Sequence, residues 1–352
     1  MANLLVTGGA GFIGANFVHY WAAHHPDDTV TVLDVLTYAG NPANLDGLNG
    51  VDLIKGDICD TSLVETLLKD RKIDTVVHFA AESHVDRSIT GPDAFVTTNI
   101  IGTHSLLKAA RKIWLDSGTG MPHRFHHVST DEVYGSLSPT DPAFSETKQY
   151  EPNSPYSASK AASDHLVRAY HHTYGLDVTT SNCSNNYGPY QFPEKLIPLF
   201  LLNCLYGRDL PIYGDGMNVR DWLHVEDHCH GIEKVLQVGK TGETYNIGGG
   251  QELPNLRVIE EICATVDRAF AENPALAERF PDAPAANGKS SVSLKTFVTD
   301  RAGHDRRYAI DETKARGELG YAPRRTFAEG FAQTLAWYLA NEGWWRPLLA
   351  KG

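Results

Sequence analysis

The sequence is poor in cysteine and lacks long apolar runs. Its five cysteines are scattered, odd in number and form no Cys-x-x-Cys pair, so we expect neither a disulfide framework nor a thiol redox motif. No apolar run approaches about 18 residues, so no membrane span is predicted. We also see no basic segment followed by an apolar one at the start, and therefore expect no secretory signal and a cytoplasmic, reducing location.

An excess of positive charge is also missing. The 352 residues carry 43 acidic and 31 basic side chains, for a net charge of −12, which argues against nucleic acid or an anionic membrane as a partner. Histidines are frequent, and His228-Cys229-His230 is the densest cluster. Positions i and i+2 of a helix do not face one another, so we predict no metal site there.

A glycine-rich turn stands near the beginning of the chain. An apolar strand pattern over residues 3–7 leads into Gly8-Gly9-Ala10-Gly11-Phe12-Ile13-Gly14, and a helical pattern follows over residues 15–23. Glycines in this context allow the backbone to approach a pyrophosphate, which the helix N-terminus attracts. We predict dinucleotide contacts at Gly8, Gly11, Phe12, Ile13 and Gly14.

The next strand, over residues 29–33, ends in Asp34, which lies 20 residues beyond Gly14. This is the usual position of the acid that binds the ribose hydroxyls of the dinucleotide. No Lys or Arg occurs before Lys55, and a 2′-phosphate would need such a cation. The pattern therefore favours NAD over NADP.

Strand and helix patterns alternate as far as residue 183. Strands are expected over residues 51–55, 73–79, 123–128 and 177–183, with helices over 62–70, 99–112 and 156–174. Alternation of this kind predicts an α/β, Rossmann-type, doubly wound parallel sheet. Ligands bind such sheets at the carboxyl ends of the strands, where we expect cofactor contacts from Asp57, Ile58, Ala80, Ala81 and Ser129. Asp57 could equally be a turn or capping residue.

The pattern changes after about residue 185. We predict an NAD-binding domain over residues 1–184, with a return segment near 219–247. A smaller C-terminal α/β substrate domain would take residues 185–218 and 248–352, with a Pro-, Ala- and Ser-rich loop over 281–296.

A hydroxyl and two carboxylates follow the strand that ends at Val128, in the order Thr130-Asp131-Glu132. Tyr156 and Lys160 are spaced to share one face of a helix. A nearby ammonium favours a phenolate, so we expect Tyr156 to ionise near neutral pH and to take a proton from an alcohol. Asp131 and Glu132 in isolation would be read as a solvated turn or cap, but their position after a parallel strand favours catalysis.

Together these motifs resemble the extended short-chain dehydrogenase/reductase superfamily, and within it the dTDP-glucose 4,6-dehydratases among the nucleotide-sugar dehydratases. The similarity spans nearly the whole chain and is carried by residues 8–14, 80–88, 129–135, 156–160, 182–189, 192–198, 218–227 and 303–308. The Thr-Asp-Glu triplet is its specific part. The loop at 281–296 is longer than the resemblance leads us to expect.

The resemblance implies loss of water from dTDP-glucose with NAD as cofactor. Tyr156, with Thr130 and Lys160, would deprotonate the C4 hydroxyl, Glu132 would remove the C5 hydrogen and Asp131 would protonate the departing C6 hydroxyl. It adds Ser83, Asn99, Tyr156, Lys160 and Asn185 to the cofactor contacts. It implies substrate contacts from Ser83, His84, Thr130, Asn185, Glu194, Lys195, Leu196, Tyr213, Arg220, Asn255, Arg301 and His304.

Three alternatives remain from the sequence. One is a 4-epimerase, which the Thr-Asp-Glu triplet disfavours. Another is a dehydratase for a different nucleotide-diphosphate sugar, since thymine and uracil differ by one methyl group, which contributes only about 1–3 kcal/mol to discrimination. The last is a catalytically silent NAD sensor, which would not need Tyr156 and Lys160. The resemblance also implies a homodimer joined through residues 94–112 and 156–174.

Overall fold

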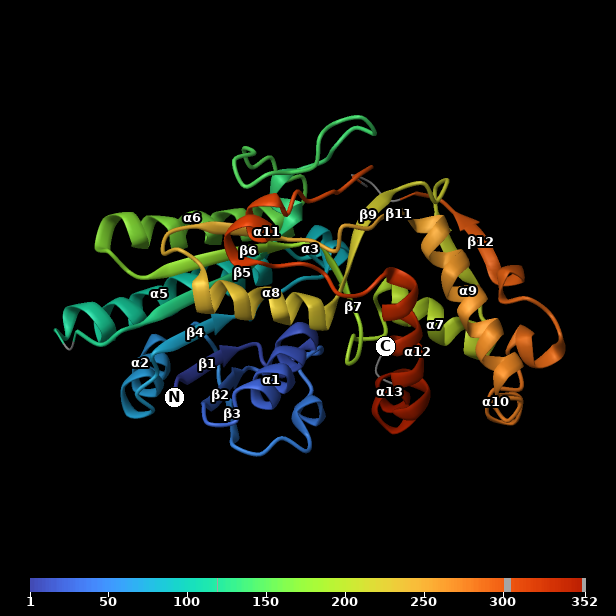
Figure 1. Ribbon diagram of the computed structural model, residues 1–352, viewed down its shortest axis with the longest axis horizontal. Coiled ribbons are helices and arrows are strands. Elements are labelled where there is room, and N and C mark those ends of the chain that lie inside the picture. Colours follow the sequence, from blue (N-terminus) through green and yellow to red (C-terminus); the bar gives the residue numbers. More distant parts are fainter. Residues whose placement is uncertain (119, 301–304, 350–352) are drawn as a thin grey trace.

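The computed structural model describes residues 1–118, 120–300 and 305–349 (Figure 1). Its largest feature is a seven-stranded sheet in the order β10-β6-β5-β4-β1-β2-β3, in which every neighbouring pair is parallel. This confirms the predicted doubly wound fold. The strands are β1 (Asn3–Thr7), β2 (Thr29–Asp34), β3 (Val51–Lys55), β4 (Thr75–His78), β5 (Arg124–Thr130), β6 (Val178–Cys183) and β10 (Thr244–Ile247).

Helices cover both faces of this sheet because its strands carry apolar side chains on both sides. In β1, Leu5 packs into one core, whereas Leu4 and Val6 pack into the core on the other face. Side chains from α2 (Thr61–Asp70), α5 (Thr103–Ala110) and α6 (Pro155–Tyr174) form the first core. The second core is formed by α1 (Phe12–His24) and α8 (Val225–Val238).

The predicted helix over 99–112 is helical but not uniform. The α5 segment is flanked by π-helical turns at Val96–Gly102 and Arg111–Asp116. Two short helices that the sequence pattern did not predict, α3 (Val85–Thr90) and α4 (Asp93–Phe95), precede it. A π turn adds one residue per turn, which changes the direction of the side chains that follow.

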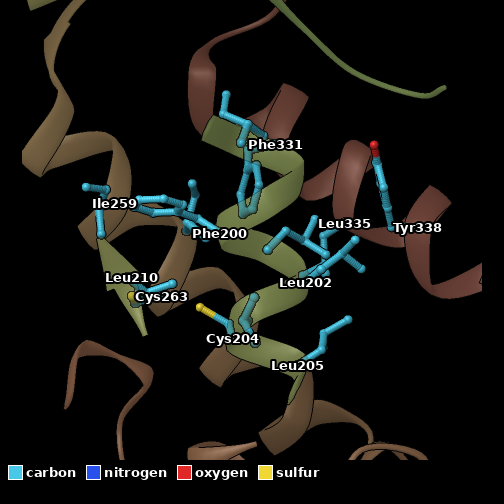
Figure 2. Close-up of a cluster of buried hydrophobic side chains, with 14 of the residues drawn as sticks. Phe200, Leu202, Cys204, Leu205, Leu210, Ile259, Cys263, Phe331, Leu335 and Tyr338 are labelled. Atoms are coloured by element: carbon cyan, nitrogen blue, oxygen red, sulfur yellow. The ribbon is translucent and has the colours of Figure 1, made fainter. Parts of the chain in front are cut away.

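A third apolar core lies in the C-terminal part of the chain. Figure 2 shows Phe200, Leu202, Ile259, Phe331 and Leu335 converging in it. They come from α7 (Leu196–Tyr206), α9 (Asn255–Glu272) and α12 (Phe327–Ala340), and α13 (Glu342–Leu349) adds Trp345 and Leu348 as buried residues. The sheets here are small: β7 (Asn185–Tyr187), β9 (Val219–His224) and β11 (Glu252–Pro254) form one, and β8 (Leu210–Tyr213) pairs with β12 (Lys295–Val298).

The chain returns to the large sheet in two steps. β9 pairs with β7 and β11, so this part of the 219–247 segment lies outside the large sheet, whereas β10 pairs with β6 at its edge. The segment over 281–296 contains two 3-10 turns, and Ser290 and Ser291 bond Asp267 of α9. It is therefore packed against α9. The division into domains stays a prediction.

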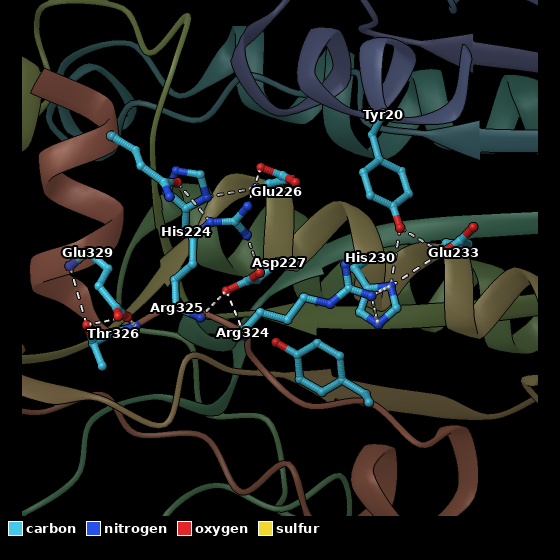
Figure 3. Close-up of polar contacts among 12 residues, drawn as sticks. Tyr20, His224, Glu226, Asp227, His230, Glu233, Arg324, Arg325, Thr326 and Glu329 are labelled. Atoms are coloured by element: carbon cyan, nitrogen blue, oxygen red, sulfur yellow. Dashed lines mark hydrogen bonds and ion pairs between the residues drawn. The ribbon is translucent and has the colours of Figure 1, made fainter. Parts of the chain in front are cut away.

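A polar network joins the C-terminal layer to the sheet layer (Figure 3). Asp227 of α8 is 1% exposed and accepts bonds from the backbone N–H groups of Arg324 and Arg325 and from Arg325 Nη1 at 2.7 Å. On the same helix, Glu233 accepts a bond from Tyr20 of α1 at 2.7 Å. Because the segment that leads into α12 is bonded to α8, these bonds tie the start of α12 to the sheet layer.

None of the helices in the described parts of the chain has the length and apolar character needed to cross a membrane.

His228, from the histidine cluster in the sequence, has its Nδ1 atom 3.0 Å from Asn186 Oδ1. No group of three His, Cys, Asp or Glu side chains suited to a metal ion occurs within the described ranges.

Candidate active site

A cavity of about 430 Å³ opens at the carboxyl edge of the large sheet, where the strand order reverses between β1 and β4. This is the place where doubly wound sheets bind ligands. All but one of the residues predicted to contact the cofactor line it: Gly8, Gly11, Phe12, Ile13, Gly14, Asp34, Asp57, Ile58, Ala80, Ala81, Ser83, Ser129, Tyr156, Lys160 and Asn185.

The glycine turn at this cavity has room for backbone only. Gly8 has φ +70°, and a Cβ there would lie 2.6 Å from the backbone nitrogen of Ala80. A Cβ on Gly14 would lie 2.3 Å from the carbonyl oxygen of Gly8. No side chain caps the N-terminus of α1, so the N–H groups of its first turn face the cavity edge without a competing side chain. This cradle fits the pyrophosphate of a dinucleotide.

Asp34 ends β2 beside the glycine turn. Its carboxylate accepts bonds from Ala10 N at 3.0 Å and Leu36 N at 2.8 Å, and burial raises its pKa above the usual value. Lys55 lies opposite Asp34 on β3 but does not line the cavity. Among the described lining residues, Lys160 and Lys195 are the only cations. The site therefore fits NAD, because no Lys or Arg beside Asp34 lines the cavity where a 2′-phosphate would lie.

Asn99 is the exception among the cofactor predictions. Its side chain is 1% exposed and does not line the cavity. Its amide donates to Glu82 O at 3.0 Å and to Ser159 Oγ at 2.8 Å, and it accepts from Glu82 N at 2.9 Å. The structure thus places Asn99 behind the cavity wall, where it joins the loop after β4 to α6.

A second cavity, of about 340 Å³, adjoins the first. Ser83, Glu132, Asn185, Glu194 and Lys195 line both, so the two cavities meet at these side chains. The remaining predicted substrate residues divide between them. His84, Leu196, Tyr213, Arg220 and Asn255 line the second cavity, Thr130 lines the first, and Arg301 and His304 lie outside the described residues.

The Thr-Asp-Glu triplet stands at the end of β5. A 3-10 turn begins at Asp131, and Thr130 Oγ1 caps it by accepting from Glu132 N at 3.3 Å. Asp131 is 2% exposed, and its Oδ2 has no hydrogen-bond partner among the described residues. Burial, and after it the neighbouring Glu132, raises the pKa of Asp131 well above its usual range. A carboxyl group in this state holds a proton and can act as an acid.

Tyr156 and Lys160 lie one turn apart on α6, and both line the cofactor cavity. The protein surroundings of Tyr156 oppose the ionisation near neutral pH that the sequence predicts, and that ionisation stays a prediction. Burial, and after it Glu132, raises the pKa of Tyr156 well above its usual value. Lys160 donates to Val128 O at 2.8 Å, and burial lowers the pKa of Lys160. The predicted spacing of the two residues on one helix is correct. Spacing alone, however, gives no information about the free-energy cost of burying a phenolate next to a carboxylate.

Asp164 is a buried acid next to the site that sequence reasoning missed. It follows Lys160 by one further turn of α6, so the spacing Tyr156–Lys160–Asp164 was the available signal. Its carboxylate accepts from Ser129 Oγ at 2.8 Å and lies 3.0 Å from His127 Nε2. Burial raises the pKa of Asp164 to about 6, although Lys160 acts in the opposite direction. A buried acid therefore lies directly behind the Tyr–Lys pair.

Tyr38 and Arg87 were also missed. Both bond Glu194 where the cavities meet, Tyr38 Oη at 3.0 Å and Arg87 Nη2 at 3.1 Å, and the Arg87 guanidinium lies 3.6 Å from the centre of the Tyr38 ring. The three side chains come from the loop after β2, from α3 and from the loop before α7. Because these three residues lie far apart in the sequence, no local pattern indicated that they would meet.

Arg220 is a cation that lines the second cavity. The positive charge of Arg220 acts to lower the pKa of Asp131, against the larger effect of burial. Its guanidinium donates to Val219 O at 2.7 Å and to Asp305 O at 3.0 Å. Its guanidinium lies 4.3 Å from the ring centre of Tyr308, which also lines this cavity. Such a fork suits a phosphate group.

Comparisons with known proteins agree with this geometry. The GDP-mannose 4,6 dehydratase family model matches residues 5–334. A dTDP-glucose 4,6-dehydratase from Xanthomonas campestris is 54% identical over 354 residues, which cover 99% of this chain and 96% of the relative.

Two solved dTDP-glucose 4,6-dehydratases are also similar. The Streptomyces venezuelae structure, which holds NAD and thymidine diphosphate, is 49% identical with a TM-score of 0.86 and covers 98% of this chain and 99% of its own. The Bacillus anthracis structure, in complex with NAD, is 44% identical with a TM-score of 0.84 and covers 99% and 100%. The chain therefore belongs to the nucleotide-sugar 4,6-dehydratase family, among the dTDP-glucose 4,6-dehydratases.

Proposed function

We propose that this protein removes water from dTDP-glucose to give dTDP-4-keto-6-deoxyglucose, with NAD as its resident cofactor. The observation that carries the proposal is the Asp131–Glu132 pair between the two cavities. Glu132 lines both cavities, whereas Asp131 is buried in the wall of the first. Oxidation of an alcohol needs only Tyr156 and Lys160, so an adjacent acid and base support an elimination as well.

The first step is removal of the proton from the C4 hydroxyl by Tyr156. The hydrogen bond from Thr130 lowers the pKa of Tyr156, while burial and Glu132 raise it. Lys160, fixed by its bond to Val128 O, is positioned to hold positive charge on the same helix face. When bound, NAD would supply the hydride acceptor at C4, a positively charged ring and the return of the hydride to C6.

The second step is elimination across C5 and C6. A ketone at C4 acidifies the C5 hydrogen, which Glu132 removes, and Asp131 gives its proton to the departing C6 hydroxyl. The surroundings support these two roles: Asp131 is buried and has its pKa raised, whereas Glu132 lines the space where the cavities join. In the elimination, one carboxyl loses a proton as the other gains one. After the hydride returned to C6, Glu132 would give its proton back to C5, and the proton that Tyr156 took from the C4 hydroxyl would restore Asp131 by way of solvent.

The substrate lies in the second cavity in this proposal. Arg220 would pair with the diphosphate, and Leu196, Tyr213 and Asn255 supply an apolar wall, an aromatic ring and an amide to the same cavity. The Asn255 Oδ1 atom is buried and has no hydrogen-bond partner among the described residues. An N–H group of a base could satisfy it.

The reaction is tested by its product and by its isotope path. Purified protein is incubated separately with dTDP-, UDP-, GDP- and CDP-hexoses, and the products are analysed by mass spectrometry. We expect loss of one water from dTDP-glucose, with deuterium from C4 recovered at C6 of the same molecule. A C4 epimer as the product, or stoichiometric release of reduced nicotinamide into solution, contradicts the proposal.

We further propose a homodimer in the cytoplasm. Val96 and Ile101, within the predicted interface, are 48% and 51% exposed, and Tyr174 at the end of α6 is 43% exposed. Exposed apolar side chains on neighbouring helices support a protein contact. All five cysteines are free thiols, which is consistent with a reducing compartment.

A further inference from the structure

Trp344, on the C-terminal helix α13, is bonded to the segment that supports the glycine turn. Its indole Nε1 donates to Asn44 Oδ1 at 2.6 Å, across 300 positions of sequence. Asn44 lies in the 3-10 turn Pro42–Leu45, which follows β2, and its side chain is 1% exposed. A buried amide whose acceptor atom is occupied by a distant helix is held in one orientation.

The other end of the same amide fixes the glycine turn. Asn44 Nδ2 donates to Ala10 O at 2.8 Å, and Asn41 N donates to the same oxygen at 3.0 Å. Ala10 N in turn donates to Asp34 at 3.0 Å. Ala10 is thus bonded on one side to the proposed ribose-binding acid and on the other to Asn44, in the middle of the turn that lines the cofactor cavity.

Aromatic packing holds Trp344 in place. The ring of Trp344 lies 5.0 Å from Trp337 and 5.7 Å from Tyr190, both nearly perpendicular to it. Tyr190 stacks on His19 of α1 with 5.4 Å between ring centres, and His19 lies 2.8 Å from Asn44 O. The backbone of Tyr190 has φ +62°, a conformation that a non-glycine residue keeps only where its surroundings hold it.

We propose that Trp344 and Asn44 are positioning residues for NAD, through which α13 sets the geometry of the glycine turn and hence the affinity for the dinucleotide. Neither side chain lines the cofactor cavity, so the effect acts through Ala10. The inference rests on the proposed use of NAD and goes beyond it, because it makes cofactor affinity depend on the last helix of the C-terminal layer. Binding that needs a preformed turn weakens when the turn is free to move.

The test is a titration of the full-length chain, stripped of bound nucleotide, with NAD in a calorimeter. We expect Trp344→Phe, which keeps the ring but loses the N–H donor, to weaken NAD binding about fivefold to tenfold, the effect of one neutral hydrogen bond. Asn44→Asp keeps the acceptor for Trp344 but places a carboxylate oxygen against Ala10 O, so a larger loss is expected. At saturating NAD, kcat and the KM for the nucleotide sugar should stay close to the unaltered values.

Trp337→Phe is the matched control. Trp337 packs against Tyr190 and Trp344, and no bond joins it to Asn44 in the described structure, so its NAD affinity should not change. Unchanged affinity in Trp344→Phe, with an unchanged melting temperature, would overturn the inference. So would equal losses in the Phe variants at 337 and 344, since packing alone would then explain them. If the unaltered chain bound no NAD, the cofactor assignment itself would fall, and the inference with it.

Discussion

Asp131 and Glu132 are neighbours in sequence but differ in surroundings. Asp131 is buried and its pKa is raised well above the usual range, first by burial and then by Glu132. Glu132 borders the space shared by both cavities. Two adjacent carboxyl groups can therefore be in different protonation states, which is the condition for one to act as acid and the other as base.

Glu132→Gln should separate elimination from cofactor binding. The amide cannot remove the C5 hydrogen, so we expect exchange of that hydrogen with solvent to slow by about 10²–10⁴, the usual contribution of a general base. NAD affinity, measured by calorimetry, should change by less than about threefold. Equal losses in exchange and in NAD affinity would mean that Glu132 has a structural role.

Asp164 should make the stability of the chain fall as the pH rises from about 4 to 6. Its folded pKa of about 6 lies above the ordinary 3.8, so the folded state binds the proton more tightly than the unfolded state. Full ionisation then costs about 3 kcal/mol. Asp164→Asn stays neutral, so its free energy of unfolding, relative to the unaltered chain, should rise across this window and level off above it.

Denaturation in urea at several pH values measures this difference. Asp141 is a control whose ionisation should change stability in the opposite direction. A hydrogen bond from Ser138 lowers the pKa of its carboxyl, so its contribution to stability is lost as the pH falls. Parallel stability curves for Asp164→Asn and the unaltered chain would show that Asp164 ionises in the folded state as it does in the unfolded one.

At the scale of single elements, a cap at the N-terminus of α6 holds the turn that carries Tyr156, the proposed base. Ser154 Oγ accepts from Ser157 N at 3.0 Å, and Ser154 N donates to Ser157 Oγ at 3.0 Å, which forms a reciprocal cap. Pro155 follows as the first helical residue, and Tyr156 lies in the capped turn. The cap therefore stabilises the turn that carries Tyr156 as well as the helix end.

Ser154→Ala should affect stability and catalysis together. Loss of the cap costs about 1 kcal/mol, and fraying of the first turn should lower kcat severalfold at saturating substrate. Thr326→Ala removes the similar cap of α12, which is remote from Tyr156. It should lower the melting temperature by a comparable amount and leave kcat unchanged. Equal kcat values in the two variants would show that the cap does not position Tyr156.

At the scale of the whole molecule, the proposed dimer depends on a face formed by the π turn Val96–Gly102 and by α6. Ile101 is 51% exposed on this face. Ile101→Glu would bury a charge in the interface, so we expect the chain to elute as a monomer when light scattering is measured during size-exclusion chromatography. Phe297→Glu, at a site 59% exposed in β12, is the control and should leave the mass unchanged. A dimer in both variants would place the interface elsewhere.

Local patterns were sufficient to predict much of the fold. The bounds of β3 match the predicted 51–55, and α6 begins within one residue of its prediction and ends before Gly175, whose φ of +74° makes it a helix-ending residue. The glycine turn and Asp34 were predicted because spacing in a βαβ unit determines where side chains emerge. Short α3 and the π turns were not predicted, because their sequences carry no strong periodicity.

The sequence by itself determined the parallel sheet, the cofactor turn and the candidate residues at the strand ends, because each of these depends on neighbours within about 30 positions. Only the tertiary structure decided the direction in which the pKa values of Tyr156 and Asp131 move, since burial and the nearby Glu132 raise both. It also placed Asn99 behind the cavity and brought Trp344 to Asn44. Those outcomes depend on desolvation and on contacts between distant segments, which no local pattern contains.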